Sequence, residues 1–77
     1  MCPINVVPAG KTVEIRRLLG GRSFIMKLQE MGLFPGSFVN VIQNSGGALL
    51  VSVGSSRFAI GRGMAGKIFV SERDLSK

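Results

Sequence analysis

A glycine-rich run at residues 61–66, G-R-G-M-A-G, has the type and spacing of residues that could bind a phosphate group. It fits the G-x-G-x-x-G pattern, which holds dinucleotide phosphates when a helix follows it inside a βαβ unit. Here the run leads into the apolar residues 68–70, which predict a strand, and too few residues remain for a mononucleotide fold. We therefore interpret the glycines as a bend in the chain rather than as a cofactor site.

The remaining side chains with possible chemistry are scattered. Cys2 and four methionines are soft ligands that suit Cu(I) in principle, but their spacing indicates no site. The chain has no histidine, which excludes a Ser-His or Cys-His catalytic pair and removes the commonest ligand of transition metals. The four carboxylates are too few and too far apart to indicate a metal site. We predict no catalytic residue, no cofactor and no metal ligand, so the chain is not expected to be an enzyme.

The charge of the chain favours an anionic partner. Ten Lys and Arg against four Asp and Glu give a net charge of +6. The basic residues are dispersed, and only Arg16 and Arg17 are adjacent. Small basic barrels that bind nucleic acid add aromatic stacking, whereas this chain has no Trp or Tyr. A solvated basic surface is therefore the favoured interpretation, with nucleic-acid binding as the alternative.

One segment, residues 24–36, has a clear helical pattern. Its apolar residues recur at helical spacing and share one face: Phe24, Leu28 and Met31. Ser23 is the expected N-cap, and Gly32 is expected to end the helix in a left-handed conformation. Phe34-Pro35-Gly36-Ser37 has the residue preferences of a type II turn.

The other apolar segments alternate as short strands do. Five strands are expected, at residues 12–16, 38–43, 49–53, 57–60 and 68–70, with a bend at 17–19 that turns Leu18 and Leu19 inward. Five short strands in a chain of 77 residues bury their inner faces best by closing into a small barrel, with the helix covering one end. We predict one mainly β domain over residues 1–77, with a core at about 6–70 and a polar tail at 71–77. No leader pattern or long apolar run is present, so we expect a cytoplasmic protein without membrane insertion.

A partner-binding surface is expected beside the helix. Met26 falls off the apolar face of the helix, and Leu33, Phe34 and Pro35 lie between the helix stop and the turn. These apolar residues either pin the helix to the sheet or form a patch for a protein partner, and one of Leu33 and Phe34 can point each way. We name Met26, Leu33, Phe34 and Pro35 as candidate partner-binding residues.

The chain resembles the FeoA family, the ferrous iron transport proteins A, over residues 6–70. The resemblance rests on P-A-G-K-T-V-E-I at 8–15, L-Q-E-M-G-L-F-P-G at 28–36, L-L-V-S-V-G at 49–54, F-A-I at 58–60 and A-G-K-I-F-V at 65–70. It implies a small SH3-like β-barrel with one short α-helix inserted between the first and second strands. It also implies a cytoplasmic accessory or regulatory module of ferrous iron uptake, which binds the FeoB-type membrane GTPase transporter.

Two positions depart from the family pattern. The loop at residues 44–47 lacks the proline that the family often has, and Ala59-Ile60-Gly61 stands where the family often has Ala-Leu-Arg, with the arginine displaced to Arg62. The same fold occurs as the C-terminal domain of iron-dependent repressors, but this chain has no DNA-reading helix-turn-helix. A transition-metal-binding or metal-sensing module is a further alternative.

Overall fold

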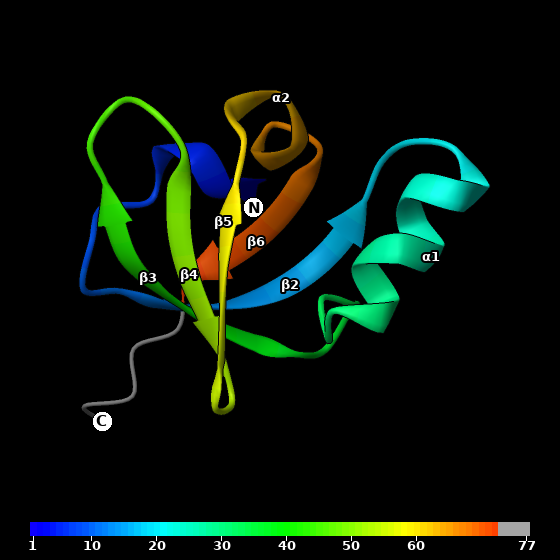
Figure 1. The fold of residues 1–77 in the computed structure, drawn as a ribbon, viewed down its shortest axis with the longest axis horizontal. Helices are drawn as coiled ribbons and strands as arrows, with labels where there is room; N and C mark the ends of the chain where they lie inside the picture. The colour runs from blue at the N-terminus through cyan, green and yellow to red at the C-terminus, as the bar shows by residue number, and fades with distance from the viewer. Residues whose placement is uncertain (73–77) are drawn as a thin grey trace.

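The computed structural model describes residues 1–72, and these form one curved antiparallel sheet with short helices at its margins (Figure 1). The helical elements are a 3₁₀ turn at Ile4–Val6 and two α-helices, α1 at Arg22–Glu30 and α2 at Arg62–Ala65. The strands are β1 Cys2–Pro3, β2 Thr12–Leu18, β3 Phe38–Asn44, β4 Leu49–Val53, β5 Ser56–Ile60 and β6 Ile68–Glu72.

The sheet has six strands in the order β1-β6-β2-β3-β4-β5. The mainly β fold is confirmed, but the predicted count of five strands is wrong, because Cys2 pairs with Val70 and Pro3 with Phe69. A strand of two residues has no alternation that a sequence pattern could reveal. Within residues 1–72, β1 and β5 are edge strands that do not pair with each other, so the hydrogen bonding does not close the sheet into the expected barrel.

Two bulges bend the sheet. The register shifts between Ile15 and Arg17 where β2 pairs with β6, and between Val41 and Gln43 where β3 pairs with β4. An extra residue in one strand increases the local twist, which suits a sheet this strongly curved. The first bulge lies just before the expected bend at 17–19. Leu18 is half-buried as predicted, whereas Leu19 is 40% exposed and its predicted inward position is wrong.

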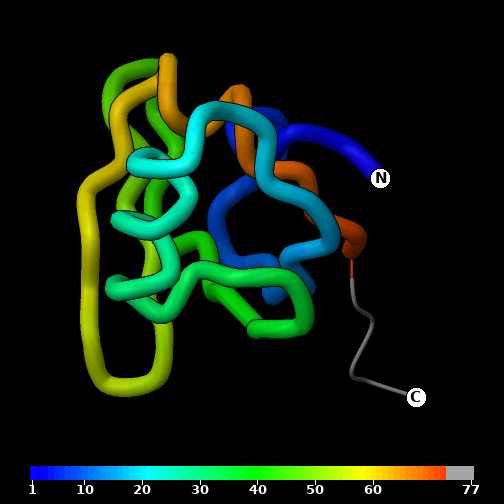
Figure 2. The backbone as a smooth tube through the Cα atoms, turned by 90° about the vertical axis from the view of Figure 1, so that its right-hand side faces the viewer, coloured from blue at the N-terminus to red at the C-terminus, as the bar shows by residue number. Residues whose placement is uncertain are grey.

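The core lies on the concave side of the sheet and is entirely apolar among the described residues. Its largest members come from every strand except β1: Val13, Ile15, Val39, Val41, Leu49, Val51, Ile60, Ile68 and Val70, with Ile4, Leu28 and Leu33 from the segments beside the sheet. Figures 1 and 2 show α1 beside the β4–β5 hairpin at one side of the sheet. Leu28 is fully buried, and Phe24 and Met31 pack partly buried against the core, as the helical pattern predicts.

Three local expectations need correction. Gly21, not Ser23, is the N-cap of α1, and it has no side-chain cap, so Ser23 lies inside the helix. Residues 62–65 form the short helix α2 where only a bend was expected, and Ala65 is buried. β6 extends to Glu72, so the first two residues of the expected polar tail belong to the sheet, and residues 73–77 lie outside the described part.

Candidate protein-binding surface

The C-terminal end of α1 forms a Schellman motif, which sets the direction in which the chain leaves the helix. The N–H of Gly32 donates to the Gln29 carbonyl at 3.0 Å, and the N–H of Leu33 donates to the Leu28 carbonyl at 2.8 Å. Gly32 has φ +88°, the left-handed conformation that the motif requires at this position. Leu28 and Leu33 are both fully buried, which supplies the apolar contact that usually accompanies the motif. The predicted helix stop is confirmed.

The turn after the helix is rigidly held. Gly36 has φ +98°, and the N–H of Ser37 donates to the Phe34 carbonyl at 3.0 Å, as in the predicted type II turn. The Ser37 hydroxyl reinforces it by donating to the Phe34 carbonyl at 2.8 Å and accepting from the Phe34 N–H at 3.2 Å. Backbone bonds between Gly36 and Ile15 (2.8 Å) and between Ile15 and Ser37 (2.9 Å) tie the turn to β2. The surface that it presents is therefore formed before any partner arrives.

The structure separates the four predicted partner-binding residues into three exposed and one buried. Met26 is 52% exposed and Phe34 is 43% exposed, and Pro35 is also exposed. Leu33 is fully buried, so its assignment to the surface is wrong: the Schellman motif turns it into the core and leaves Phe34 outside. We call Met26, Phe34 and Pro35 the helix–turn surface.

Phe38 is a further exposed aromatic residue that the sequence reasoning did not select. It is the first residue of β3 and is 46% exposed. The alternation of β3 contained the signal, because Val39 and Val41 face the core and the intervening positions must face outward. Phe38 therefore adds a further exposed apolar side chain to the segment that follows the turn.

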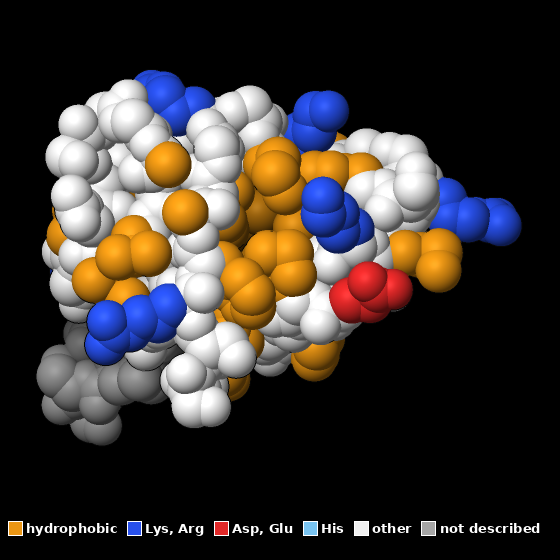
Figure 3. All heavy atoms as spheres, viewed as in Figure 1, with side chains coloured by type: hydrophobic (Ala, Val, Ile, Leu, Met, Phe, Trp, Pro, Cys, Tyr) orange, Lys and Arg blue, Asp and Glu red, His pale blue; other side chains and the backbone are white. Residues whose placement is uncertain are grey.

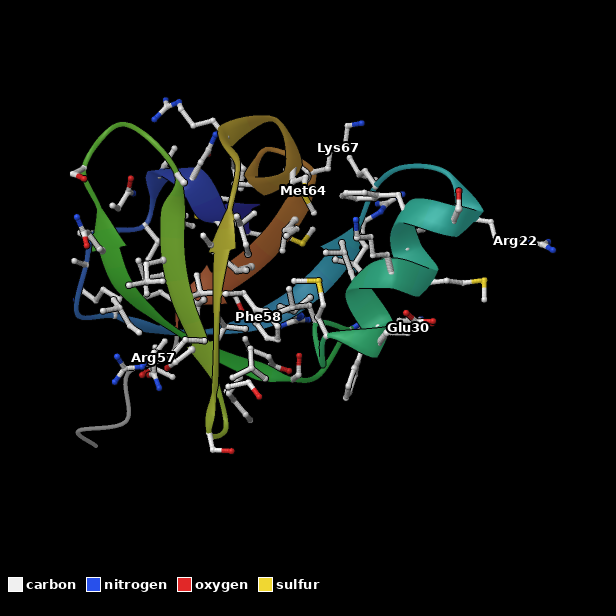
Figure 4. The ribbon with its side chains drawn as sticks, in the orientation of Figure 1. Arg22, Glu30, Arg57, Phe58, Met64 and Lys67 are labelled. Atoms are coloured by element: carbon white, nitrogen blue, oxygen red, sulfur yellow. The ribbon has the colours of Figure 1, made fainter. Side chains whose placement is uncertain are left out.

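The charges on α1 are mostly basic. Arg22 and Lys27 lie on the helix with Glu30 at its end, and Figure 4 shows Arg22 pointing away from the rest of the molecule. Lys67 lies over the ring of Phe24, 5.4 Å from its centroid, in a cation–π arrangement. Apolar residues set among basic ones suit a partner segment with apolar and acidic side chains.

The glycine-rich run has a structural use. Gly61 is the N-cap of α2, and the Arg62 guanidinium Nη1 donates to the Gly46 carbonyl at 3.0 Å, joining α2 to the loop between β3 and β4.

In residues 1–72, no three side chains of the types His, Cys, Asp and Glu come together in a group that could hold a metal ion. Over the same residues, no helix is both long and apolar enough to cross a membrane.

Comparison with known proteins gives one consistent family. The FeoA domain family model matches residues 2–72. A curated protein of Methanocaldococcus jannaschii, named for Fe(2+) transport as protein A, is 34% identical over 74 residues, which cover 96% of this chain and 90% of the relative. A crystal structure of an iron uptake regulatory protein, FeoA, superposes with a TM-score of 0.85 at 38% identity and covers 94% of this chain and 96% of that one.

More distant structures share the fold alone. The solution structure of iron(II) transport protein A from Clostridium thermocellum has a TM-score of 0.80 at 23% identity, covering 91% of this chain and 44% of that one. A manganese-dependent transcriptional repressor has a TM-score of 0.82 at 18% identity, and the match covers 92% of this chain but only 41% of the repressor. The same small β architecture therefore occurs both alone and within longer chains.

Proposed function

This chain belongs to the FeoA family, and from that premise we propose that it is a non-enzymatic accessory or regulatory module of ferrous iron uptake. Its partner is the cytoplasmic part of a FeoB-type membrane GTPase transporter, and the chain itself is cytoplasmic. The role in ferrous iron uptake is supported by family membership and by the relatives that are named for iron transport or iron uptake.

The observation that carries the proposal is the exposure of apolar side chains on α1 and in the rigid turn that follows it. Met26 and Phe34 are each roughly half exposed, although Met and Phe are residues that soluble domains usually bury. The Schellman motif and the type II turn hold Phe34 and Pro35 in place. A preformed patch loses little conformational entropy when it binds, so even a small one can contribute affinity.

The module acts by binding the states of its partner unequally. A ligand with equal affinity for two states shifts neither, whereas a tenfold preference moves the equilibrium by about 1.4 kcal/mol. A guanine-nucleotide-driven change in the GTPase domain provides two such states. The sign of the preference decides whether the module promotes or restrains transport.

The test is a binding titration between this chain and the cognate transporter in detergent or nanodisc. Calorimetry or biolayer interferometry is run with GDP and again with a non-hydrolysable GTP analogue. We expect saturable binding with different dissociation constants for the two nucleotides. If no saturable binding is seen with either nucleotide, the transporter is not the partner of this chain. If binding is seen but the two dissociation constants are equal, the chain docks on the transporter without regulating it.

A further inference from the structure

The edge strand β5 has backbone groups that no other strand of the described chain uses. The two-residue loop Gly54-Ser55 joins β4 to β5 and makes Val53 and Ser56 a directly opposed pair. In a two-residue hairpin this closing pair exchanges hydrogen bonds, and the bonded pairs then alternate, so Phe58 and Ile60 also bond to β4. The N–H and C=O groups of Arg57 and Ala59 therefore point away from β4, along the free edge of the sheet.

An apolar strip lies beside this edge. It consists of side chains that pack against the core but are only partly buried: Phe24 and Met31 from α1, Val53 from β4, Phe58 from β5 and Met64 from α2. Figure 3 shows apolar side chains gathered between β5 and α1, and Figure 4 shows Phe58 and Met64 pointing into that space. We call these five residues the β5–α1 strip.

Both ends of the strip are defined by contacts. At one end Lys67 lies over the Phe24 ring at 5.4 Å. At the other, Val53 faces Gly32 so closely that a Cβ there would come within 3.3 Å of its Cγ1. A free strand edge and an adjoining apolar strip are the two features that strand-addition sites combine, since the edge binds the peptide backbone and the strip receives alternate side chains.

We propose that β5 binds an extended peptide by antiparallel strand addition, with an apolar peptide residue opposite Phe58 and an acidic one opposite Arg57. Residues directly opposite on neighbouring strands lie on the same face. Phe58 faces the β5–α1 strip, whereas Arg57 and Ala59 are exposed on the other face. A peptide that alternates acidic and apolar residues matches both faces at once.

The positive charge of this chain favours an acidic peptide over a second copy of the chain as the occupant of the β5 edge. The chain carries a net charge of +6, so two copies repel, and pairing of two β5 edges would bring a second Arg57 onto the same face. A peptide with glutamates lowers the local positive charge instead. This inference concerns a surface apart from Met26, Phe34 and Pro35 and does not depend on the transporter being the partner.

The test uses an acetylated and amidated heptapeptide, Val-Glu-Val-Glu-Val-Glu-Val, titrated into the ¹⁵N-labelled full chain and followed by NMR. We expect saturable shifts concentrated in β5 and the β5–α1 strip, with affinity that falls as salt increases. The absence of shifts at millimolar peptide would overturn the proposal, as would shifts spread over all basic residues. Concentration-dependent shifts of β5 without peptide would also overturn it, because a second copy would then occupy the edge.

Two perturbations address the backbone hydrogen bonds. N-methylation of the peptide glutamates removes the N–H groups that face Arg57 and Ala59 without altering the protein. Ala59→Pro removes an N–H that points away from β4, and proline is tolerated at such edge positions. We expect each to weaken binding about tenfold or more. Unchanged affinity of the N-methylated peptide would exclude strand addition, whatever the fold of the proline variant.

A charge exchange addresses the acidic position. Arg57→Glu is expected to weaken binding of the Val-Glu peptide and to strengthen binding of a peptide that alternates valine and lysine in the same pattern. Arg22→Glu has the same net charge but lies on α1, pointing away from the molecule (Figure 4), and is the matched control. If both variants come to prefer the lysine peptide to the same extent, the attraction depends only on net charge, and the pairing of Arg57 with a peptide glutamate is refuted.

Discussion

Replacing Gly32 by alanine tests whether the end of α1 requires a glycine in the left-handed conformation. Gly32 has φ +88°, and a side chain in the left-handed region costs about 1–2 kcal/mol. The new Cβ would also lie 3.3 Å from the Val53 Cγ1, which must move by a few tenths of an ångström. Loss of glycine flexibility in the unfolded chain offsets about 0.4–1 kcal/mol. The net expectation is a destabilisation of about 1 kcal/mol, which lowers Tm by about 4–8 °C in a domain of this size.

Gly47→Ala is the matched control. Gly47 does not have a positive φ, and beyond its chain neighbours no atom lies within 4 Å of the position that a Cβ would take. This variant should be neutral or slightly stabilised, by up to about 1 kcal/mol. Both variants are measured by urea unfolding followed by circular dichroism. A Gly32→Ala variant as stable as Gly47→Ala would refute the argument that the helix end requires a left-handed glycine.

Two further changes probe the packing and the surface charge. Leu28→Ala removes a fully buried side chain at the Schellman contact and should lower the free energy of unfolding by about 2–5 kcal/mol in denaturant titrations; a loss under about 1 kcal/mol would contradict its place in the core. Glu72→Gln breaks the Lys11–Glu72 ion pair, whose atoms lie 3.2 Å apart with both side chains more than half exposed. It should change stability by less than about 1 kcal/mol, and a larger loss in thermal melts would show that this pair matters more than exposed pairs usually do.

Features that depend on neighbouring residues could be predicted from the sequence. The apolar spacing placed Leu28 in the core, Gly32 marked the end of α1, and Pro35-Gly36 marked the type II turn. Each rests on a backbone preference or a side-chain period within a few residues. The same locality explains why the longer strands were expected near their observed bounds and why Met26 was correctly expected to be exposed.

Features that depend on distant residues could not be predicted. Cys2–Pro3 becomes a strand only because β6 lies beside it, more than sixty residues later in the chain. The free edge of β5 likewise follows from the order of strands in the sheet, which no local pattern contains. The burial of Leu33 rather than Phe34 is a different case, because it follows from the local Schellman motif, whose usual contact between Leu28 and Leu33 the sequence reasoning did not use.

The most direct test of the central claim is binding of the cognate transporter by two variants with equal charge. Met26→Lys places a lysine in the helix–turn surface, and Val6→Lys places one at an apolar site that is 62% exposed on the 3₁₀ turn instead. Substitution of exposed residues should leave both variants within about 0.5 kcal/mol of the parent stability. We predict that Met26→Lys weakens transporter binding at least about tenfold and that Val6→Lys leaves it unchanged within about twofold. Equal affinities for the two variants would contradict docking through the helix–turn surface.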